Sequence, residues 1–212
     1  MKKGHRPQSL STLCEQGLIL LDRDGVLNAM TVDPEQGTID SPLHPDQVEI
    51  LPGVPEAVAQ LTRAGYRLAI VSNQPAWAKR KTTRKNLESV HYKIVRGAES
   101  GGGRIVSSHL CFHRAEDRCN CRKPRTGLLK EAIRKYPQSK KEKIWMVGDG
   151  VTDMQAGQAL GLKTAFIAKW KNEVFQRLKQ NNLSPTLWTD SLAHFARALL
   201  LTASGRQIKT IH

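Results

Sequence analysis

Aromatic residues are scarce in this 212-residue chain, where Phe, Trp and Tyr together make up 5%. No stretch interleaves aromatic and basic residues into the stacking platform on which single-stranded nucleic acids bind. The chain also lacks any apolar run close to the roughly 18 residues that a membrane-spanning helix needs. These absences argue against a nucleic-acid-binding module and against a membrane protein.

Acidic residues are few as well, 19 against 33 Lys and Arg, so the formal net charge is +14. A basic surface favours anionic partners such as phosphorylated metabolites, nucleic acid or acidic membranes, although a surface that is basic only for solubility explains it equally well. The length fits one domain, with a flexible lead-in at residues 1–16 and a tail at 202–212. The basic start is not followed by the apolar core of a signal peptide, so we expect a cytoplasmic protein, and a monomer.

The chain contains only four cysteines, and a cytoplasmic protein is not expected to join them as disulfides. Three of them lie within eleven residues, together with one histidine. Three thiolates and an imidazole suit tetrahedral zinc, and a set that fills four positions leaves none for a substrate. The alternative is a chance cluster without metal, and Cys14 is expected to be a spare thiol. The predicted ligands of this structural zinc are Cys111, His113, Cys119 and Cys121.

Three short apolar runs, at residues 18–21, 68–71 and 144–147, each end in polar residues. Runs of this length predict buried strands of a parallel sheet. The carboxyl ends of parallel strands meet at one edge, where open α/β sheets bind ligands. Two neighbouring carboxylates are costly unless a cation or proton shares them, so Asp22 and Asp24 predict a metal site, with an ordinary Asp-Gly turn as the alternative. The polar residues that end the other two runs are Ser72, Asn73, Gln74, Asp149 and Asp153.

Strand and helix patterns alternate along the chain, as they do in a parallel sheet with helices on both faces. Helices are expected near residues 54–64, 82–99, 128–136, 153–160, 170–180 and 191–200. Further strands are expected at 164–168 and 184–188, with a short apolar stretch at 105–106 and a long connection over 28–51.

Arg122 and Lys123 directly follow the last cysteine of the cluster. A loop held by metal is well suited to aim two cations at a phosphate, because Arg can fork onto two oxygens while Lys acts as a point charge. The alternative is that both are surface cations of a basic protein. Phosphoryl transfer needs mainly alignment and charge compensation, which these cations and a metal would provide.

These residues form four motifs that resemble, in order and spacing, those of the haloacid dehalogenase superfamily of phosphatases. More narrowly, the segments DRDGVLN, SNQ, CRKP and GDGVTDMQAG resemble the D-glycero-D-manno-heptose 1,7-bisphosphate phosphatases and the related histidinol-phosphatases. The resemblance covers residues 17–168. The loop at 75–80 departs from it, because PAWAKR stands where the heptose enzymes usually have Ser-Gly and Arg-Gly pairs. The motif residues are Asp22, Asp24, Ser72, Lys123, Asp149 and Asp153.

The resemblance implies a Rossmann-like α/β fold with a minimal cap and a zinc-stapled loop, forming a phosphatase domain over residues 17–201. It implies a Mg²⁺-dependent phosphatase that acts on a sugar phosphate, with D-glycero-D-manno-heptose 1,7-bisphosphate of nucleotide-heptose biosynthesis as the expected substrate. Histidinol phosphate is the first alternative, and a nucleic-acid-binding protein or polynucleotide end-phosphatase is the second.

The resemblance also implies roles for individual residues. Asp22 would be the nucleophile that forms an aspartyl-phosphate, and Asp24 the general acid and base. Ser72 and Lys123 complete the implied catalytic set by holding the transferred phosphoryl group. The implied substrate contacts are Asn28, Ser72, Asn73, Arg122 and Lys123, and the implied Mg²⁺ ligands are Asp22, the backbone carbonyl of Asp24, Asp149 and, in addition, Asp153.

Overall fold

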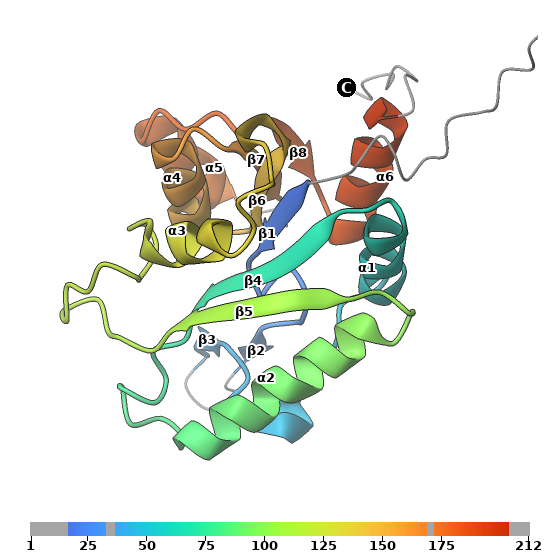
Figure 1. Cartoon of the computed structure of the whole chain (residues 1–212). Coiled ribbons are helices and arrows are strands. Elements are labelled where there is room, and N and C mark those ends of the chain that lie inside the picture. The colour runs from blue at the N-terminus through green and yellow to red at the C-terminus, as the bar shows by residue number, and fades with distance from the viewer. Residues whose placement is uncertain (1–16, 33–36, 169–171, 204–212) are drawn as a thin grey trace, which may run out of the picture.

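The computed structural model describes residues 17–32, 37–168 and 172–203, and its centre is a six-stranded parallel sheet in the order β5-β4-β1-β6-β7-β8 (Figure 1). The predicted lead-in, most of the predicted tail and the first two residues of the helix predicted at 170–180 lie outside these ranges. The strands are β1 (Leu18–Leu21), β4 (Arg67–Asn73), β5 (Ile105–Cys111), β6 (Ile144–Gly148), β7 (Lys163–Ile167) and β8 (Leu187–Thr189). The predicted parallel α/β architecture is confirmed.

Helices cover both faces of the sheet (Figure 1). Successive side chains of a strand point to opposite faces. Ile19 and Leu21 of β1 therefore pack with α1, α2 and α6, whereas Leu18 and Leu20 pack with α3 and α4. The helices are α1 (Val54–Arg63), α2 (Arg84–Glu99), α3 (Gly127–Arg134), α4 (Val151–Ala159), α5 (Asn172–Gln180) and α6 (Leu192–Ala203).

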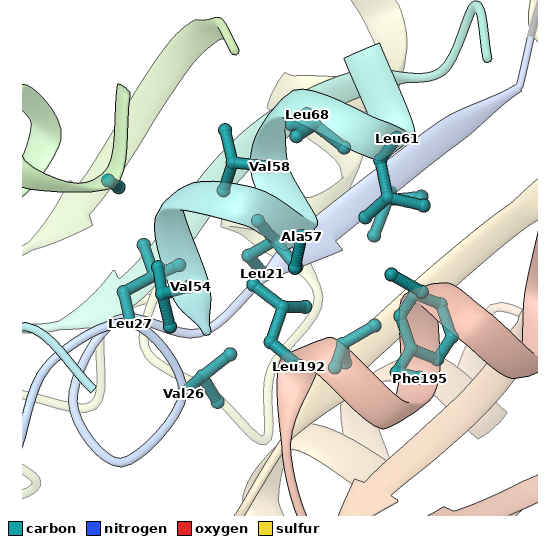
Figure 2. Packing of buried hydrophobic residues seen from close by; sticks show 14 of the residues in the cluster. Leu21, Val26, Leu27, Val54, Ala57, Val58, Leu61, Leu68, Leu192 and Phe195 are labelled. Atoms are coloured by element: carbon teal, nitrogen blue, oxygen red, sulfur yellow. The ribbon is translucent and has the colours of Figure 1, made fainter. Parts of the chain in front are cut away.

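The larger core cluster forms where α1 and α6 lie side by side over β1 (Figure 2). Val54, Val58 and Leu61 recur at helical spacing and are all buried, as the sequence pattern predicts. Leu192 and Phe195 of α6 face this stripe (Figure 2). Each such side chain contributes about 1.5–3 kcal/mol when it is removed from water. This packing fixes β1, the strand that leads into Asp22.

Strand β5 is longer than the apolar stretch at 105–106 suggested. It lies at the edge of the sheet with β4 as its neighbour, so most of its residues are only partly buried. Ser107, Ser108 and His109 occupy its middle. These polar residues interrupt the apolar run by which a buried strand is predicted, so the sequence indicated only the first two residues.

The predicted long connection between β1 and α1 is partly structured. Its described residues contain the antiparallel hairpin of β2 (Thr31–Val32) and β3 (Ile39–Asp40), followed by the 3₁₀ helix η2 (Pro45–Gln47). A second 3₁₀ helix, η3 (Lys141–Lys143), leads into β6. Among the described residues, no helix has both the length and the apolar character that crossing a membrane would require.

Candidate active site

The ends of β1, β4 and β6 lie next to one another, as the sequence predicted. Leu21 is opposite Ile70 of β4 and Val147 of β6, so the three strands run in step. The backbone N–H of Asp22 donates to the Val147 carbonyl at 2.9 Å, which continues the pairing one residue beyond β1. The polar residues that follow these strands therefore share the edge of the sheet at which α/β proteins bind ligands.

Lys123 reaches into this edge from the loop before α3. Its side chain is buried, and its Nζ lies 2.8 Å from Asp22 Oδ1, 2.6 Å from Asp153 Oδ1 and 2.8 Å from the Val71 carbonyl. Burial alone would lower the pKa of Lys123, but the carboxylates of Asp153 and Asp22 outweigh it and raise the pKa. Lys123 is therefore a fixed positive charge beside Asp22.

Asn73 holds the backbone of Lys123 in place. Its amide nitrogen donates to the Lys123 carbonyl at 3.1 Å, and its amide oxygen accepts from the Lys123 N–H at 3.0 Å. Because both polar atoms of the Asn73 side chain serve this purpose, the structure places Asn73 against Lys123. It was predicted as a substrate contact.

Asp22, Asp149 and Asp153 form a cluster in which one carboxylate oxygen from each lies within 4.8 Å of the others. Burial raises the pKa of Asp153, and Asp22 and Asp149 add to the rise while Lys123 opposes it. A cation shared by the three carboxylates would relieve this repulsion. Oxygen ligands from carboxylates are what Mg²⁺ binds, so the donor set fits the predicted metal.

Two glycines leave room for these carboxylates. Gly25 has a φ of 81°, and a Cβ on it would lie 2.1 Å from Asp149 Oδ2. A Cβ on Gly148 would lie 2.3 Å from Asp153 Oδ2. Any larger residue at either position would displace a carboxylate of the cluster.

The carboxylate of Asp24 is held by three buried side chains. Arg23 Nη2 donates to its Oδ1 at 3.1 Å, Asn28 Nδ2 to its Oδ1 at 2.9 Å and Gln74 Nε2 to its Oδ2 at 2.6 Å. Gln74 also accepts from Arg23 at 2.6 Å and donates to Ser72 Oγ at 3.0 Å. Burial alone would raise the pKa of Asp24, but Arg23 and the amide donors of Asn28 and Gln74 outweigh it and lower the pKa.

Two members of this network were not among the predicted catalytic or substrate-binding residues: Arg23 had no predicted role, and Gln74 was expected only as one of the polar residues that end a strand. Arg23 is fully buried although it is charged, and its place between two motif aspartates in a largely apolar segment was the available signal. Asn28 was predicted as a substrate contact. The structure buries it completely, and its amide nitrogen donates to Asp24 and to the Ala29 carbonyl.

The Cys/His cluster closes around one point, as its spacing predicted. The distances from Cys121 Sγ to the sulfurs of Cys111 and Cys119 are 3.2 and 3.3 Å, and its distance to His113 Nδ1 is 3.2 Å. A tetrahedral zinc with bonds of about 2.0–2.3 Å separates its ligand atoms by roughly 3.5–3.8 Å, close to this spacing. Burial opposes ionisation of Cys119, but the N–H of Arg122 and the neighbouring thiols lower its pKa. The donor set fits zinc.

Arg122 directly follows the last cysteine of this cluster and bonds back to it. Its backbone N–H donates to Cys119 Sγ at 3.4 Å, and its Nη1 donates to the His113 carbonyl at 3.3 Å. The guanidinium is therefore attached to the Cys/His loop, one residue before Lys123. The structure thus brings the two predicted sites together through adjacent residues.

Comparisons with known proteins identify the family. A D-glycero-beta-D-manno-heptose-1,7-bisphosphate 7-phosphatase from Neisseria meningitidis is 36% identical over 156 residues, which cover 74% of this chain and 79% of that protein. The Histidine biosynthesis bifunctional protein HisB from Legionella pneumophila is 32% identical over 152 residues, 72% of this chain and 41% of that protein.

A solved structure with a similar name also matches this chain. The crystal structure of D,D-heptose 1,7-bisphosphate phosphatase from B. bronchiseptica, complexed with magnesium and phosphate, matches with a TM-score of 0.74 and 30% identity, covering 88% of this chain and 99% of that one. A family model described as haloacid dehalogenase-like hydrolase matches residues 38–161. The chain belongs to the haloacid dehalogenase-like hydrolase family.

Proposed function

We propose that this chain is a phosphatase that removes one phosphate from a small sugar phosphate by way of an aspartyl-phosphate on Asp22. The observation that carries the proposal is the 2.8 Å contact of Asp22 Oδ1 with Lys123 Nζ, beside the carboxylates of Asp149 and Asp153. A carboxylate attacks a phosphoryl group only when nearby cations compensate the negative charge of both. Lys123 supplies one such charge permanently.

The proposed reaction has two steps at Asp22. In the first, an Asp22 oxygen forms a bond to phosphorus, the bond from phosphorus to the sugar oxygen breaks, and Asp24 gives its proton to the leaving oxygen. In the second, water attacks phosphorus, its proton passes to Asp24, and Asp22 is released. The second step needs an ionised Asp24, and its lowered pKa favours that form. The first step needs a protonated Asp24, and an anionic phosphate that enters beside the carboxylate favours that form.

The phosphoryl group would be held by Lys123 and Ser72. The Ser72 hydroxyl oxygen accepts a hydrogen bond from Gln74 at 3.0 Å, so its own proton is left to donate to a phosphoryl oxygen. Mg²⁺ would be held by Asp22, Asp149 and Asp153 with the backbone carbonyl of Asp24, and when bound it supplies charge compensation at the phosphoryl oxygens. We assign Asn28 and Asn73 to positioning Asp24 and Lys123.

D-Glycero-D-manno-heptose 1,7-bisphosphate is the leading substrate, because the relatives named above at 36% and 30% identity are phosphatases of heptose bisphosphate. Histidinol phosphate is the second candidate, supported by the match to the histidine biosynthesis protein.

We further propose that the protein is cytoplasmic and monomeric. Size-exclusion chromatography tests the oligomeric state.

A phosphate-release assay on both compounds, with and without Mg²⁺, tests the proposal. We expect Mg²⁺-dependent release and a higher kcat/KM for the heptose bisphosphate. A preference for histidinol phosphate would reverse the order of the two candidates. If neither compound nor any other phosphorylated metabolite were hydrolysed, the proposed function would be wrong.

A further inference from the structure

The loop that follows β4, residues 75–81, is a compact turn. The N–H groups of Lys79, Arg80 and Lys81 donate to the carbonyls of Pro75, Trp77 and Ala76, each at 2.9 Å. At its end, the Lys81 ammonium pairs with Asp40 of β3. The loop after β5 carries the Cys/His cluster, and because β4 and β5 are parallel neighbours, both loops leave the sheet at the same end (Figure 1).

A groove of about 670 Å³ lies between the two loops. Its side chains carry charges of both signs, and Arg114 is paired with Asp117 at 3.4 Å within the Cys/His loop. Cations and carboxylates together suit a ligand with hydroxyl groups and an anionic end. The lining residues are Ala78, Lys79 and Arg80 from one loop and Arg114, Glu116 and Asp117 from the other.

The two loops are joined at their base, where the backbone N–H of Gln74 donates to the Cys111 carbonyl at 2.6 Å. Farther out, residues 75–81 and 112–118 are all described, and no hydrogen bond or ion pair joins them to each other. The guanidinium of Arg84 provides a link, because its Cζ lies 4.4 Å from the ring centre of Phe112 and 5.7 Å from that of Trp77. Both distances are within the range of cation–π attraction.

Arg84 is itself held in place, so it can fix the positions of the Trp77 and Phe112 rings. It is the first residue of α2, whose start is fixed by Thr83, with the Thr83 side chain accepting from the Asn86 N–H at 3.1 Å. Arg84 Nε also donates to Glu88 at 3.0 Å on the same helix. Phe112 lies between Cys111 and His113, so whatever orders the Cys/His cluster also fixes the ring on which Arg84 rests.

We propose that Arg84 is a positioning residue that couples the Cys/His loop to the loop after β4, and so sets the shape of the groove that receives the non-reacting part of the substrate. The coupling itself depends only on the Trp77, Arg84 and Phe112 contacts. Its consequence for the substrate rests on the proposed function.

Trypsin tests the coupling directly, because Lys79, Arg80 and Lys81 are cleavage sites within the loop. We expect Arg84→Ala to increase the rate of cleavage at these sites about three- to fivefold in the native protein, as followed by mass spectrometry. Glu88→Gln, which breaks the ion pair but keeps the guanidinium, and Arg96→Ala, which removes an exposed arginine from the same helix, should leave the rate unchanged. Equal cleavage in Arg84→Ala and in these two controls would overturn the proposal.

Kinetics test the consequence for the substrate. In Arg84→Ala, KM for the heptose bisphosphate should rise about fivefold while kcat changes by less than about twofold, because the reacting groups lie elsewhere. Turnover of p-nitrophenyl phosphate, which lacks a sugar, should not change. A lower kcat on both substrates with unchanged KM would contradict the role in the groove. If the bisphosphate is not hydrolysed, the leading substrate is wrong and the same comparison is made with histidinol phosphate, while the trypsin result still decides the coupling.

Discussion

Gln74 donates a hydrogen bond of 2.6 Å to Asp24, and this contact joins the loop after β4 to the loop after β1. The same side chain accepts from Arg23 at 2.6 Å. Gln74 therefore fixes both the carboxylate proposed as acid and base and the buried cation that compensates its charge. Because all three side chains are almost fully buried, none can be replaced by water without rearrangement.

Replacing Gln74 by leucine should reduce kcat about 10- to 100-fold. The reason is that a hydrogen bond to a charged group is worth about 1.5–3 kcal/mol, and its loss leaves Asp24 less firmly placed. KM should change little, since Gln74 is buried behind Ser72. Steady-state kinetics measure both parameters, with Gln158→Leu on the exposed face of α4 as the control. An unchanged kcat in a folded Gln74→Leu protein would show that this network does not serve catalysis.

Stability should fall as the pH drops from about 6.5 toward 4, in part because of His91 on α2. Burial and the nearby Arg23 lower the pKa of His91 to about 4, although Asp24 acts to raise it, and its buried Nδ1 has no hydrogen-bond partner among the residues that the structure describes. The unfolded chain, with a His pKa near 6.5, binds more protons in this window, so acid favours unfolding.

The expected loss from His91 is up to about 2 kcal/mol between pH 7 and pH 5. Urea unfolding at the two pH values measures it in the parent protein and in His91→Gln, which cannot titrate in this range. We expect the variant to lose less stability on acidification than the parent does. An identical loss in both proteins would show that His91 does not carry this dependence.

Replacing Cys119 by serine should lower the melting temperature and abolish zinc binding. A structural zinc contributes to the free energy of folding, and a hydroxyl is a poor substitute for a thiolate ligand. Elemental analysis and thermal unfolding are the measurements, with Cys14→Ser as the control because Cys14 is expected to be a spare thiol. A parent protein that contains no zinc and melts like Cys119→Ser would rule out the metal.

The sequence predicted which side chains meet at one edge of the sheet, because they follow buried strands. Asp22, Ser72 and Asp149 each end such a run, so the parallel sheet alone brings them to one edge. The Cys/His spacing was equally informative, since four ligands within eleven residues can close around a metal without any knowledge of the fold.

Other features depend on tertiary contacts that no local pattern records. Arg23 had no predicted role and Asn28 was predicted as a substrate contact, whereas the packing buries both completely around Asp24. Strand β5 is the edge strand of the sheet and pairs only with β4. It is therefore less buried than the central strands and does not need a continuous apolar run. The contact of Arg84 with Phe112 joins the start of α2 to the Cys/His loop across the whole of α2 and β5, so it too appears only in the folded chain.

Trapping the phosphoryl group on Asp22 tests the proposed nucleophile most directly. During turnover of the heptose bisphosphate with Mg²⁺, the reaction is quenched and treated with borohydride, which reduces an acyl phosphate to an alcohol. Trypsin cuts after Arg23 and so separates Asp22 from Asp24 on different peptides. We expect mass spectrometry to find position 22 reduced to homoserine, only with substrate present and not in Asp22→Asn. Reduction at Asp24, or at neither residue during rapid turnover, would contradict the proposed nucleophile.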